Sequence, residues 1–258
     1  MKTKMINFLK KKNKSKIICL TAYSKNIAEE VDKIADITLV GDSLGSVLYN
    51  YSSTREVTLS DMIKHARSVR QGIKKSLMVV DMPYNTYSNY KSALKNAKKI
   101  LKETKCDAVK LEGGKKVIKQ IKYLIKNNVP VMGHLGVLPQ STKGKFRSLG
   151  KNDREKNQLL NDAVLLDQNG VFAIVLECIK TPIAKIITNK ISIPTIGIGS
   201  SVYCDGQVLV SDDLLGLNQT NIKFVKKFVN LKKEIYKGIK KFKNEVKSKK
   251  YPSKKYSY

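Results

Sequence analysis

The stretch Ala108-Val109-Lys110-Leu111-Glu112 is a short apolar run that ends on a carboxylate. Short runs of this kind between turn signals are typical of buried parallel strands. Polar groups at the carboxyl ends of such strands build the active sites of α/β barrels and doubly wound sheets. Four more runs repeat the pattern, which predicts an α/β enzyme and the end of the sheet that carries its site: Ile37–Val40 before Asp42-Ser43, Leu77–Val80 before Asp81, Val129–Gly133 before His134, and Ala173–Leu176 before Glu177.

Three further short runs bring the number of expected strands to eight. They lie at Ile17–Thr21, Pro194–Ile198 and Gln207–Val210. Segments with helical periodicity separate the strands, and alternation of this kind implies a parallel sheet. The chain length of 258 residues is typical of one (β/α)₈ barrel. We therefore predict a single TIM-barrel domain over residues 1–258, with helices at about 25–34, 60–75, 88–104, 115–127, 155–169 and 181–190.

Both ends of the chain are basic. Residues 1–16 form a basic N-terminal segment, and residues 221–258 are expected to form a C-terminal helix and tail. Within the latter, 221–247 is predicted to be one basic amphipathic helix. Two segments, 44–58 and 135–154, are longer than a connection needs and are expected to be lids or interface loops.

The net charge of +29 is the most unusual feature of the composition. It could indicate nucleic-acid or membrane binding. However, the lysines are spread over the whole chain, and Asn and Ile are abundant with them, as in proteins encoded by AT-rich DNA. We therefore expect neither a nucleic-acid partner nor membrane binding. No apolar run is long enough for a transmembrane helix, and no secretory signal is expected.

The four cysteines stand far apart and form no CxxC pair. The simplest interpretation is that all four are free thiols in a reducing compartment, so we expect a cytoplasmic protein.

Three carboxylates, Asp42, Asp81 and Glu112, follow neighbouring strands. Like charges brought together repel one another, and a hard divalent cation removes that repulsion. The trio therefore predicts a Mg²⁺ site. A single Asp in such a position would otherwise cap the following helix or pair with a lysine.

Three more side chains have a chemical interpretation and a structural one. Lys110 and Glu112 point to the same face of their strand, so Lys110 could anchor a substrate carboxylate or form a structural ion pair. His134 could donate a hydrogen bond to an anionic substrate or be a satisfied core residue. Glu177 suits a general base, or it could cap a helix. His65 is expected to be structural.

Taken together, these stretches resemble the ketopantoate hydroxymethyltransferase family across nearly the whole chain. The matching motifs are Leu20-Thr21-Ala22-Tyr23, Val40-Gly41-Asp42-Ser43-Leu44-Gly45, Asp81-Met82-Pro83-Tyr84, Val109-Lys110-Leu111-Glu112-Gly113-Gly114, Pro130-Val131-Met132-Gly133-His134 with Pro139-Gln140-Ser141, Val175-Leu176-Glu177, and Cys204-Asp205-Gly206-Gln207. The chain departs from the family pattern at Ser24, at Asn50, in the 144–150 loop and at Ser200-Ser201. None of these departures removes a residue named above.

The resemblance implies a homodecamer, one Mg²⁺ per subunit and methylenetetrahydrofolate as co-substrate. It implies transfer of a hydroxymethyl group to 3-methyl-2-oxobutanoate, giving 2-dehydropantoate for pantothenate synthesis through a Mg²⁺-stabilised enolate. The implied metal ligands are Asp42, Asp81 and Glu112, and the implied base is Glu177. Substrate binding falls on Ser43, Lys110 and His134, together with Asp42 and Asp81. A Mg²⁺-dependent carbon–carbon lyase acting on a 2-oxo acid is the alternative activity.

Overall fold

Eight parallel strands close into a barrel in chain order, as the sequence predicts. The computed structural model describes residues 2–142, 147–219 and 222–258. Each strand pairs with the next, and β1 pairs with β8, so the described sheet has no free edge. The strands are β1 Ile17–Thr21, β2 Ile37–Val40, β3 Leu77–Asp81, β4 Ala108–Glu112, β5 Val131–Gly136, β6 Ala173–Glu177, β7 Thr195–Ile198 and β8 Gly206–Leu209.

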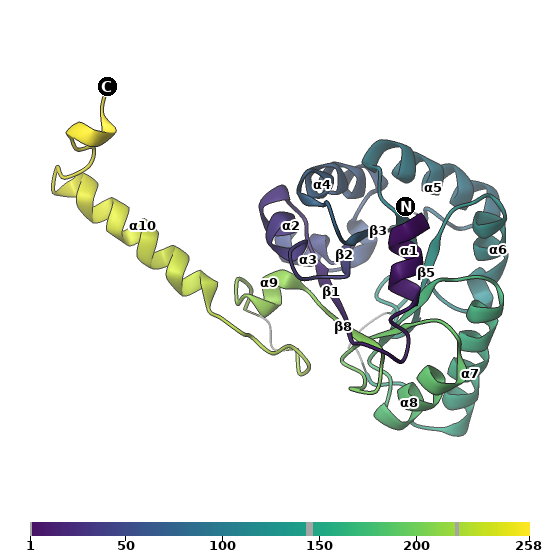
Figure 1. The fold of residues 1–258 in the computed structure, drawn as a ribbon. Coiled ribbons are helices and arrows are strands. Elements are labelled where there is room, and N and C mark those ends of the chain that lie inside the picture. The colour runs from purple at the N-terminus through teal and green to yellow at the C-terminus, as the bar shows by residue number, and fades with distance from the viewer. Residues whose placement is uncertain (1, 143–146, 220–221) are drawn as a thin grey trace. The chain divides into compact units, whose positions relative to one another are not determined.

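Helices form a ring outside the strands (Figure 1). The helices that alternate with the strands are α2 Lys25–Val31, α3 Leu44–Tyr49, α4 Leu59–Gly72, α5 Tyr90–Thr104, α6 Ile118–Lys126, α7 Asp153–Gln168 and α8 Thr181–Lys190. Short 3₁₀ turns, η1 Thr54–Glu56 and η2 Lys115–Val117, lie between them. The expectation that 44–58 is a loop was therefore wrong, because this segment contains α3 and η1; its role as a lid or interface segment remains a prediction. The second predicted loop holds the end of β5 and the start of α7, and its Gly144 lies outside the described residues.

Alternate strand residues pack on opposite sides of the barrel wall. Val79 lies in the apolar cluster inside the barrel, whereas its neighbour Val80 lies in the cluster between the strands and the helices. Cys19, Leu39 and Met132 also belong to the inner cluster. This two-residue period matters for the site, because it fixes which polar residues point inward at the strand ends.

The basic N-terminal segment contains a helix that the sequence analysis did not predict, α1 Lys2–Leu9. Phe8 of this helix is 4% exposed and belongs to the inner cluster, with its ring 5.8 Å from that of Phe172. The Lys4 Nζ atom donates to the carbonyl oxygens of Lys74 and Ser76, just before β3. Because Phe172 and Ser76 both precede strands, α1 covers the amino-terminal end of the barrel.

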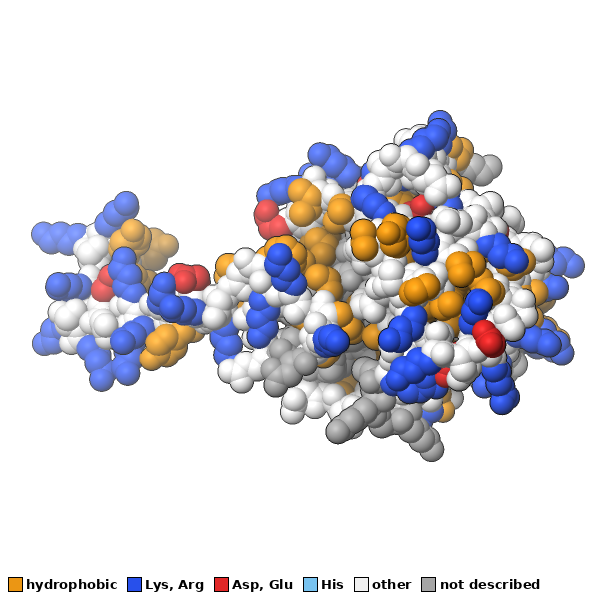
Figure 2. Space-filling view, turned by 90° about the horizontal axis from the view of Figure 1, so that it is seen from below, with side chains coloured by type: hydrophobic (Ala, Val, Ile, Leu, Met, Phe, Trp, Pro, Cys, Tyr) orange, Lys and Arg blue, Asp and Glu red, His pale blue; other side chains and the backbone are white. Residues whose placement is uncertain are grey.

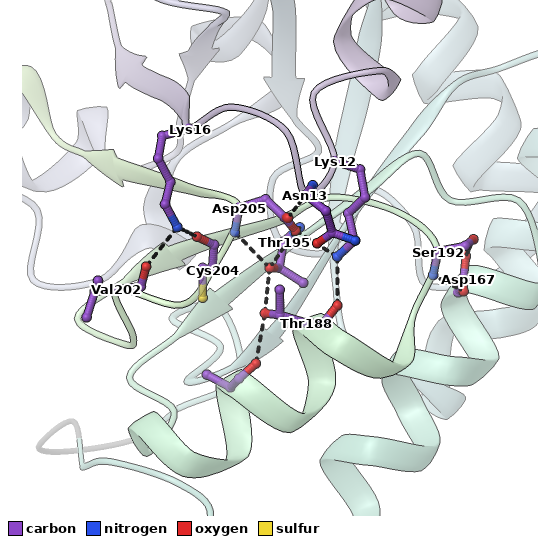
Figure 3. A network of polar contacts seen from close by, with 11 residues as sticks. Lys12, Asn13, Lys16, Asp167, Thr188, Ser192, Thr195, Val202, Cys204 and Asp205 are labelled. Atoms are coloured by element: carbon purple, nitrogen blue, oxygen red, sulfur yellow. Dashed lines mark hydrogen bonds and ion pairs between the residues drawn. The ribbon is translucent and has the colours of Figure 1, made fainter.

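A polar network fastens the segment after α1 to the same end (Figure 3). Lys12 Nζ lies 2.8 Å from Asp205 Oδ2 and 2.7 Å from the Thr188 carbonyl oxygen. The same Asp205 carboxylate accepts from the backbone and hydroxyl of Thr195 at the start of β7. These contacts stabilise the amino-terminal end of the barrel. The polar residues predicted to form the site follow the carboxyl ends of the strands, at the opposite end.

Residues 211–258 form a second compact unit, separate from the unit of residues 1–210. It contains α9 Ser211–Leu214, α10 Leu231–Lys247 and the turn η3 Lys254–Tyr256. The predicted helix start at 221 was wrong, and residue 221 itself lies outside the described residues. α10 begins at Leu231, where the side chain of Asn230 accepts from Lys233 N. That the whole chain acts as one domain remains a prediction.

The face of the protein seen in Figure 2 is basic. Lys and Arg side chains are distributed over the face seen in Figure 2 rather than gathered in one patch, with few Asp or Glu among them. Across the part of the chain that the structure describes, no helix is both long and apolar enough to span a bilayer.

Candidate active site

Five of the predicted site residues point into the carboxyl end of the barrel. In each strand every second residue faces the same side, and the residues two or four positions before each site residue belong to the inner cluster. The site residues therefore face the interior as well. The register also pairs Asp81 with Lys110, and Glu112 with His134, on adjacent strands. The rows are Leu77-Val79-Asp81 on β3, Ala108-Lys110-Glu112 on β4, Met132-His134 on β5 and Ala173-Val175-Glu177 on β6.

Lys110 is the cation at the centre of this group. It is 5% exposed, and its Nζ lies 2.9 Å from Asp81 Oδ1 and 3.4 Å from His134 Nδ1. Burial alone would lower the pKa of Lys110, but the carboxylates of Asp81, Glu112 and Asp42 outweigh it and raise the pKa. Lys110 is therefore charged, and the ion pair considered in the sequence analysis is present.

His134 connects Lys110 to Glu177. Its pKa is lowered, first by burial and then by the charge of Lys110, so the ring is neutral. Because Lys110 only donates, Nδ1 of the ring must be the acceptor, which leaves the proton on Nε2. Nε2 lies 3.1 Å from Glu177 Oε2, although the two atoms are not aligned as in a good hydrogen bond.

Glu177 is the most open member of this group. Its side chain is 13% exposed, compared with 3% for that of His134. Gly136, with φ of +100°, packs against it so closely that a Cβ there would lie 2.0 Å from the Glu177 carbonyl oxygen. Cys178 follows with φ of +52°, an uncommon conformation for a residue other than glycine. The backbone around Glu177 is therefore tightly held while its carboxylate can meet an incoming molecule.

Asp42 lies just beyond β2, and its backbone N–H donates to Asp81 Oδ2 over 3.1 Å. Burial, and next the charge of Asp81, raise the pKa of Asp42 to about 7. Burial and the charge of Asp42 likewise raise the pKa of Glu112 well above its ordinary value. These carboxylates are held together at a cost that a cation would relieve.

The donor chemistry therefore fits Mg²⁺. The carboxylates of Asp42, Asp81 and Glu112 act on one charged lysine, and that of Glu177 lies beside His134. Within the described residues, no three His, Cys, Asp or Glu side chains are already arranged as a metal cluster. Carboxylate oxygens suit Mg²⁺, which commonly takes only some of its ligands from the protein and the others from water and substrate.

Ser43 lies beside this group, at the start of α3. Its hydroxyl is 2.7 Å from the Tyr23 hydroxyl, which comes from the segment after β1. His65 is anchored through Nδ1 to the Tyr23 carbonyl oxygen and through Nε2 to the Tyr49 hydroxyl. This agrees with the structural role expected for His65.

The sequence analysis missed one buried residue of the site, Gln140. It is 2% exposed, and its side chain donates to Asp42 Oδ2 over 2.7 Å. The only signal was its place in the Pro139-Gln140-Ser141 motif, because composition and spacing do not distinguish a buried glutamine from a loop residue.

Comparisons with known proteins agree with this geometry. The family model described as ketopantoate hydroxymethyltransferase matches residues 2–254. A relative from Pelagibacter ubique, a 3-methyl-2-oxobutanoate hydroxymethyltransferase, is 61% identical over the whole of both chains. The enzyme of that name from Rhizobium etli is 46% identical over 92% of this chain and 88% of its own.

Solved structures show the same fold at low sequence identity. A phosphonopyruvate hydrolase in complex with oxalate and Mg²⁺ has a TM-score of 0.62 at 9% identity, covering 98% of this chain and 93% of its own. A 2,3-dimethylmalate lyase, of the PEP mutase/isocitrate lyase superfamily, has a TM-score of 0.62 at 11% identity, covering 99% and 88%. The structural likeness confirms the barrel, and the family match and the close relatives confirm the resemblance noted in the sequence: the chain belongs to the ketopantoate hydroxymethyltransferase family.

Proposed function

We propose that this enzyme transfers a hydroxymethyl group from methylenetetrahydrofolate to 3-methyl-2-oxobutanoate and so forms 2-dehydropantoate. The observation that carries the proposal is one arrangement of side chains. The partly exposed carboxylate of Glu177 lies beside the neutral imidazole of His134, and the buried Lys110 lies next, among the carboxylates of Asp42, Asp81 and Glu112. The carboxylate can remove a proton, and the other groups can hold an anionic keto acid. A carbon–carbon lyase would use similar groups, but the whole-length identity to hydroxymethyltransferases favours transfer.

Asp42, Asp81 and Glu112 are the residues that would hold Mg²⁺. Their oxygen atoms and the surplus of negative charge support this assignment. When bound, Mg²⁺ would act as a Lewis acid toward the oxygens of the keto acid and so acidify its C3 proton.

The remaining roles follow from the positions of the side chains. Glu177 takes the C3 proton, and its exposure gives it access to the substrate. Lys110 provides a charged partner for the substrate carboxylate, and Ser43 and the Nε2–H of His134 provide hydrogen-bond donors. The carbon that has lost its proton then attacks the one-carbon unit of the co-substrate. A new C–C bond forms, the two bonds from that unit to nitrogen are broken, water supplies the hydroxyl group, and tetrahydrofolate leaves.

For the assembly we propose a homodecamer in the cytoplasm, without a nucleic-acid or membrane partner. The family resemblance supports the oligomer. The dispersed lysines support the lack of a nucleic-acid or membrane partner. The free cysteines support a cytoplasmic location.

A turnover assay with the keto acid, methylenetetrahydrofolate and Mg²⁺ tests the proposal. Formation of 2-dehydropantoate should depend on all three, and EDTA should abolish it. Cleavage of a 2-oxo acid without folate would instead establish the lyase.

A further inference from the structure

Gln140 contacts two of the carboxylates at once. Its side-chain Nε2 donates to Asp42 Oδ2 over 2.7 Å and to the Met82 carbonyl oxygen over 3.0 Å. Its backbone N–H donates to Glu112 Oε2 over 3.1 Å. One residue of the segment after β5 thus bridges the carboxylates that follow β2 and β4, next to the backbone that follows β3.

The orientation of this side chain is fixed by its partners. The Met82 carbonyl can only accept, and so can Asp42 Oδ2 when its carboxyl group is ionised, so the amide presents its nitrogen to them. The hydroxyl of Tyr87 donates to the amide oxygen from the opposite side. Every polar atom of the Gln140 side chain is therefore used, in a place that is 2% exposed.

The backbone of Gln140 is held as firmly. Its carbonyl oxygen accepts from Arg55 Nε over 2.7 Å, and the guanidinium of Arg55 lies 4.5 Å from the centre of the Tyr84 ring. Arg55 belongs to η1, in the other long segment at this end of the barrel. The two segments are thus joined at Gln140.

We propose that Gln140 is a positioning residue that orients Asp42 and Glu112 for a divalent cation. It engages Asp42 Oδ2 and Glu112 Oε2. The second oxygen of each carboxylate is left for other partners, and Glu112 Oε1 lies 3.6 Å from His134 Nδ1. Partners of this kind around metal ligands commonly change metal affinity by about 10–100-fold when they are removed. The inference rests on the Mg²⁺ site of the proposed function.

A purely structural role for Gln140 makes a different prediction. If it only fastened the two segments together, its loss would lower the stability of the barrel and leave the cation affinity of the folded protein unchanged. Metal affinity, measured on the folded protein, therefore separates the two roles.

The experiment compares Gln140→Met with Gln120→Met. Gln120 also donates from its side chain to backbone carbonyls, those of Tyr87 and Ser88. Within the described residues no hydrogen bond joins its side chain to Asp42 or Glu112, so it is a matched control. Mn²⁺ binding to the metal-free full-length proteins is followed by electron paramagnetic resonance, without substrate. We expect Gln140→Met to bind Mn²⁺ about 10–100-fold more weakly than wild type, and Gln120→Met to bind as wild type does.

Two further measurements complete the test. Tyr87→Phe removes the hydroxyl that orients the amide and that also lies near Glu112, while leaving every carboxylate in place; we expect it to weaken Mn²⁺ binding several-fold. Turnover of Gln140→Met should recover as Mg²⁺ is raised, because its defect lies in binding the cation.

Wild-type affinity in both Gln140→Met and Tyr87→Phe, or an equal loss in Gln120→Met, would overturn the inference while leaving the proposed function intact. Absence of Mn²⁺ and Mg²⁺ binding to the wild-type protein would overturn both. If Gln140→Met does not fold, Tyr87→Phe is compared with Gln120→Met instead. Weaker Mn²⁺ binding in Tyr87→Phe alone would support the inference, and equal Mn²⁺ affinity in the two variants would overturn it.

Discussion

At the scale of single residues, environment separates two glutamates that the sequence presents in the same way. Both end an apolar strand, yet Glu112 is 5% exposed and accepts from the backbone of Gln140, whereas the Glu177 side chain is 13% exposed beside His134. The first environment suits the metal ligand that we propose, and the second suits the base that we propose. That difference depends on contacts with residues that are distant in the sequence, so it cannot be predicted from the residues next to each glutamate.

Replacing Glu177 with Gln tests the role of this proton acceptor. The amide keeps the shape but loses the basicity, so exchange of the substrate C3 proton with deuterated water should fall by about 10²–10⁴-fold. Keto-acid affinity should change little, because Lys110 remains. The exchange is measured by NMR without folate, and an unchanged rate would assign the base to another group.

Lys110→Ala should show the opposite pattern. The substrate carboxylate would lose its cationic partner, so keto-acid affinity should fall before the exchange step does. Asp81 would also lose the cation 2.9 Å from its Oδ1, which makes the metal-free protein less stable. Calorimetric titration of the keto acid measures the affinity. The exposed Lys119→Ala provides the control, and equal losses in both variants would refute a specific role.

The titration of Asp42 gives a pH prediction for the metal-free protein. Burial, followed by the charge of Asp81, raises its pKa to about 7 from 3.8. The folded state therefore holds this proton more tightly than the unfolded state, and stability is lost as pH rises from about 4 to about 7. Asp42→Asn does not titrate, so it should match wild type near pH 4 and be more stable at pH 8 by an amount on the order of a few kcal/mol.

Urea unfolding in EDTA between pH 4 and pH 8 measures this difference. Excess Mg²⁺ should stabilise the wild type at pH 8 more than Asp42→Asn. A stability difference that does not vary with pH would show that Asp42 is ionised in the folded protein throughout this range.

At the scale of elements, most strands and several helix starts could be predicted from the sequence. The apolar runs that end on Asp81, Glu112 and Glu177 were predicted to within one residue, because burial on both faces leaves an uninterrupted pattern. The start of α4, which the Thr58 side chain caps, was also predicted to within one residue, whereas α10 begins only after Asn230, well beyond the predicted start at 221. At Asn230 the sequence periodicity extends across the cap without marking it.

The helix α1 was missed for a related reason. Its sequence is short and basic, and its stability comes from contacts with distant residues rather than from its own pattern. Phe8 fills the end of the inner cluster against Phe172, a residue more than 160 positions away in the chain. The resemblance implied which residues are catalytic, but only the structure showed what closes the other end of the barrel.

Truncating Phe8 measures the contribution of α1. Phe8→Ala should lower the free energy of unfolding by about 3–5 kcal/mol, because it opens a cavity at the amino-terminal end. Urea unfolding measures the change. Ile6→Ala on the same helix is the control, since Ile6 is 52% exposed and its truncation should have little effect. A similar loss in both variants would mean that the burial of Phe8 does not account for the contribution of α1, because Ala has a higher helix propensity than either residue it replaces.

At the scale of the whole molecule, the net charge of +29 opposes assembly. Each added subunit brings lysines that are distributed over its surface, and repulsion between like-charged subunits grows with their number. Assembly of the proposed homodecamer therefore requires attractive contacts that exceed this repulsion. Exposed apolar side chains are available for contacts of this kind, for example Ile34 on the barrel unit and Ile239 and Phe242 on the C-terminal unit.

Sedimentation velocity at micromolar concentration tests this balance. We expect a species much larger than the 29.0 kDa monomer. Salt shortens the range of electrostatic repulsion, from about 30 Å at 0.01 M to about 10 Å at 0.1 M, so the oligomer should resist dilution better as salt is raised. Dissociation by salt would mean that ion pairs between subunits hold the assembly together. A monomer at every salt concentration would refute the oligomer, and turnover measured on the same samples would then show whether one barrel is sufficient for catalysis.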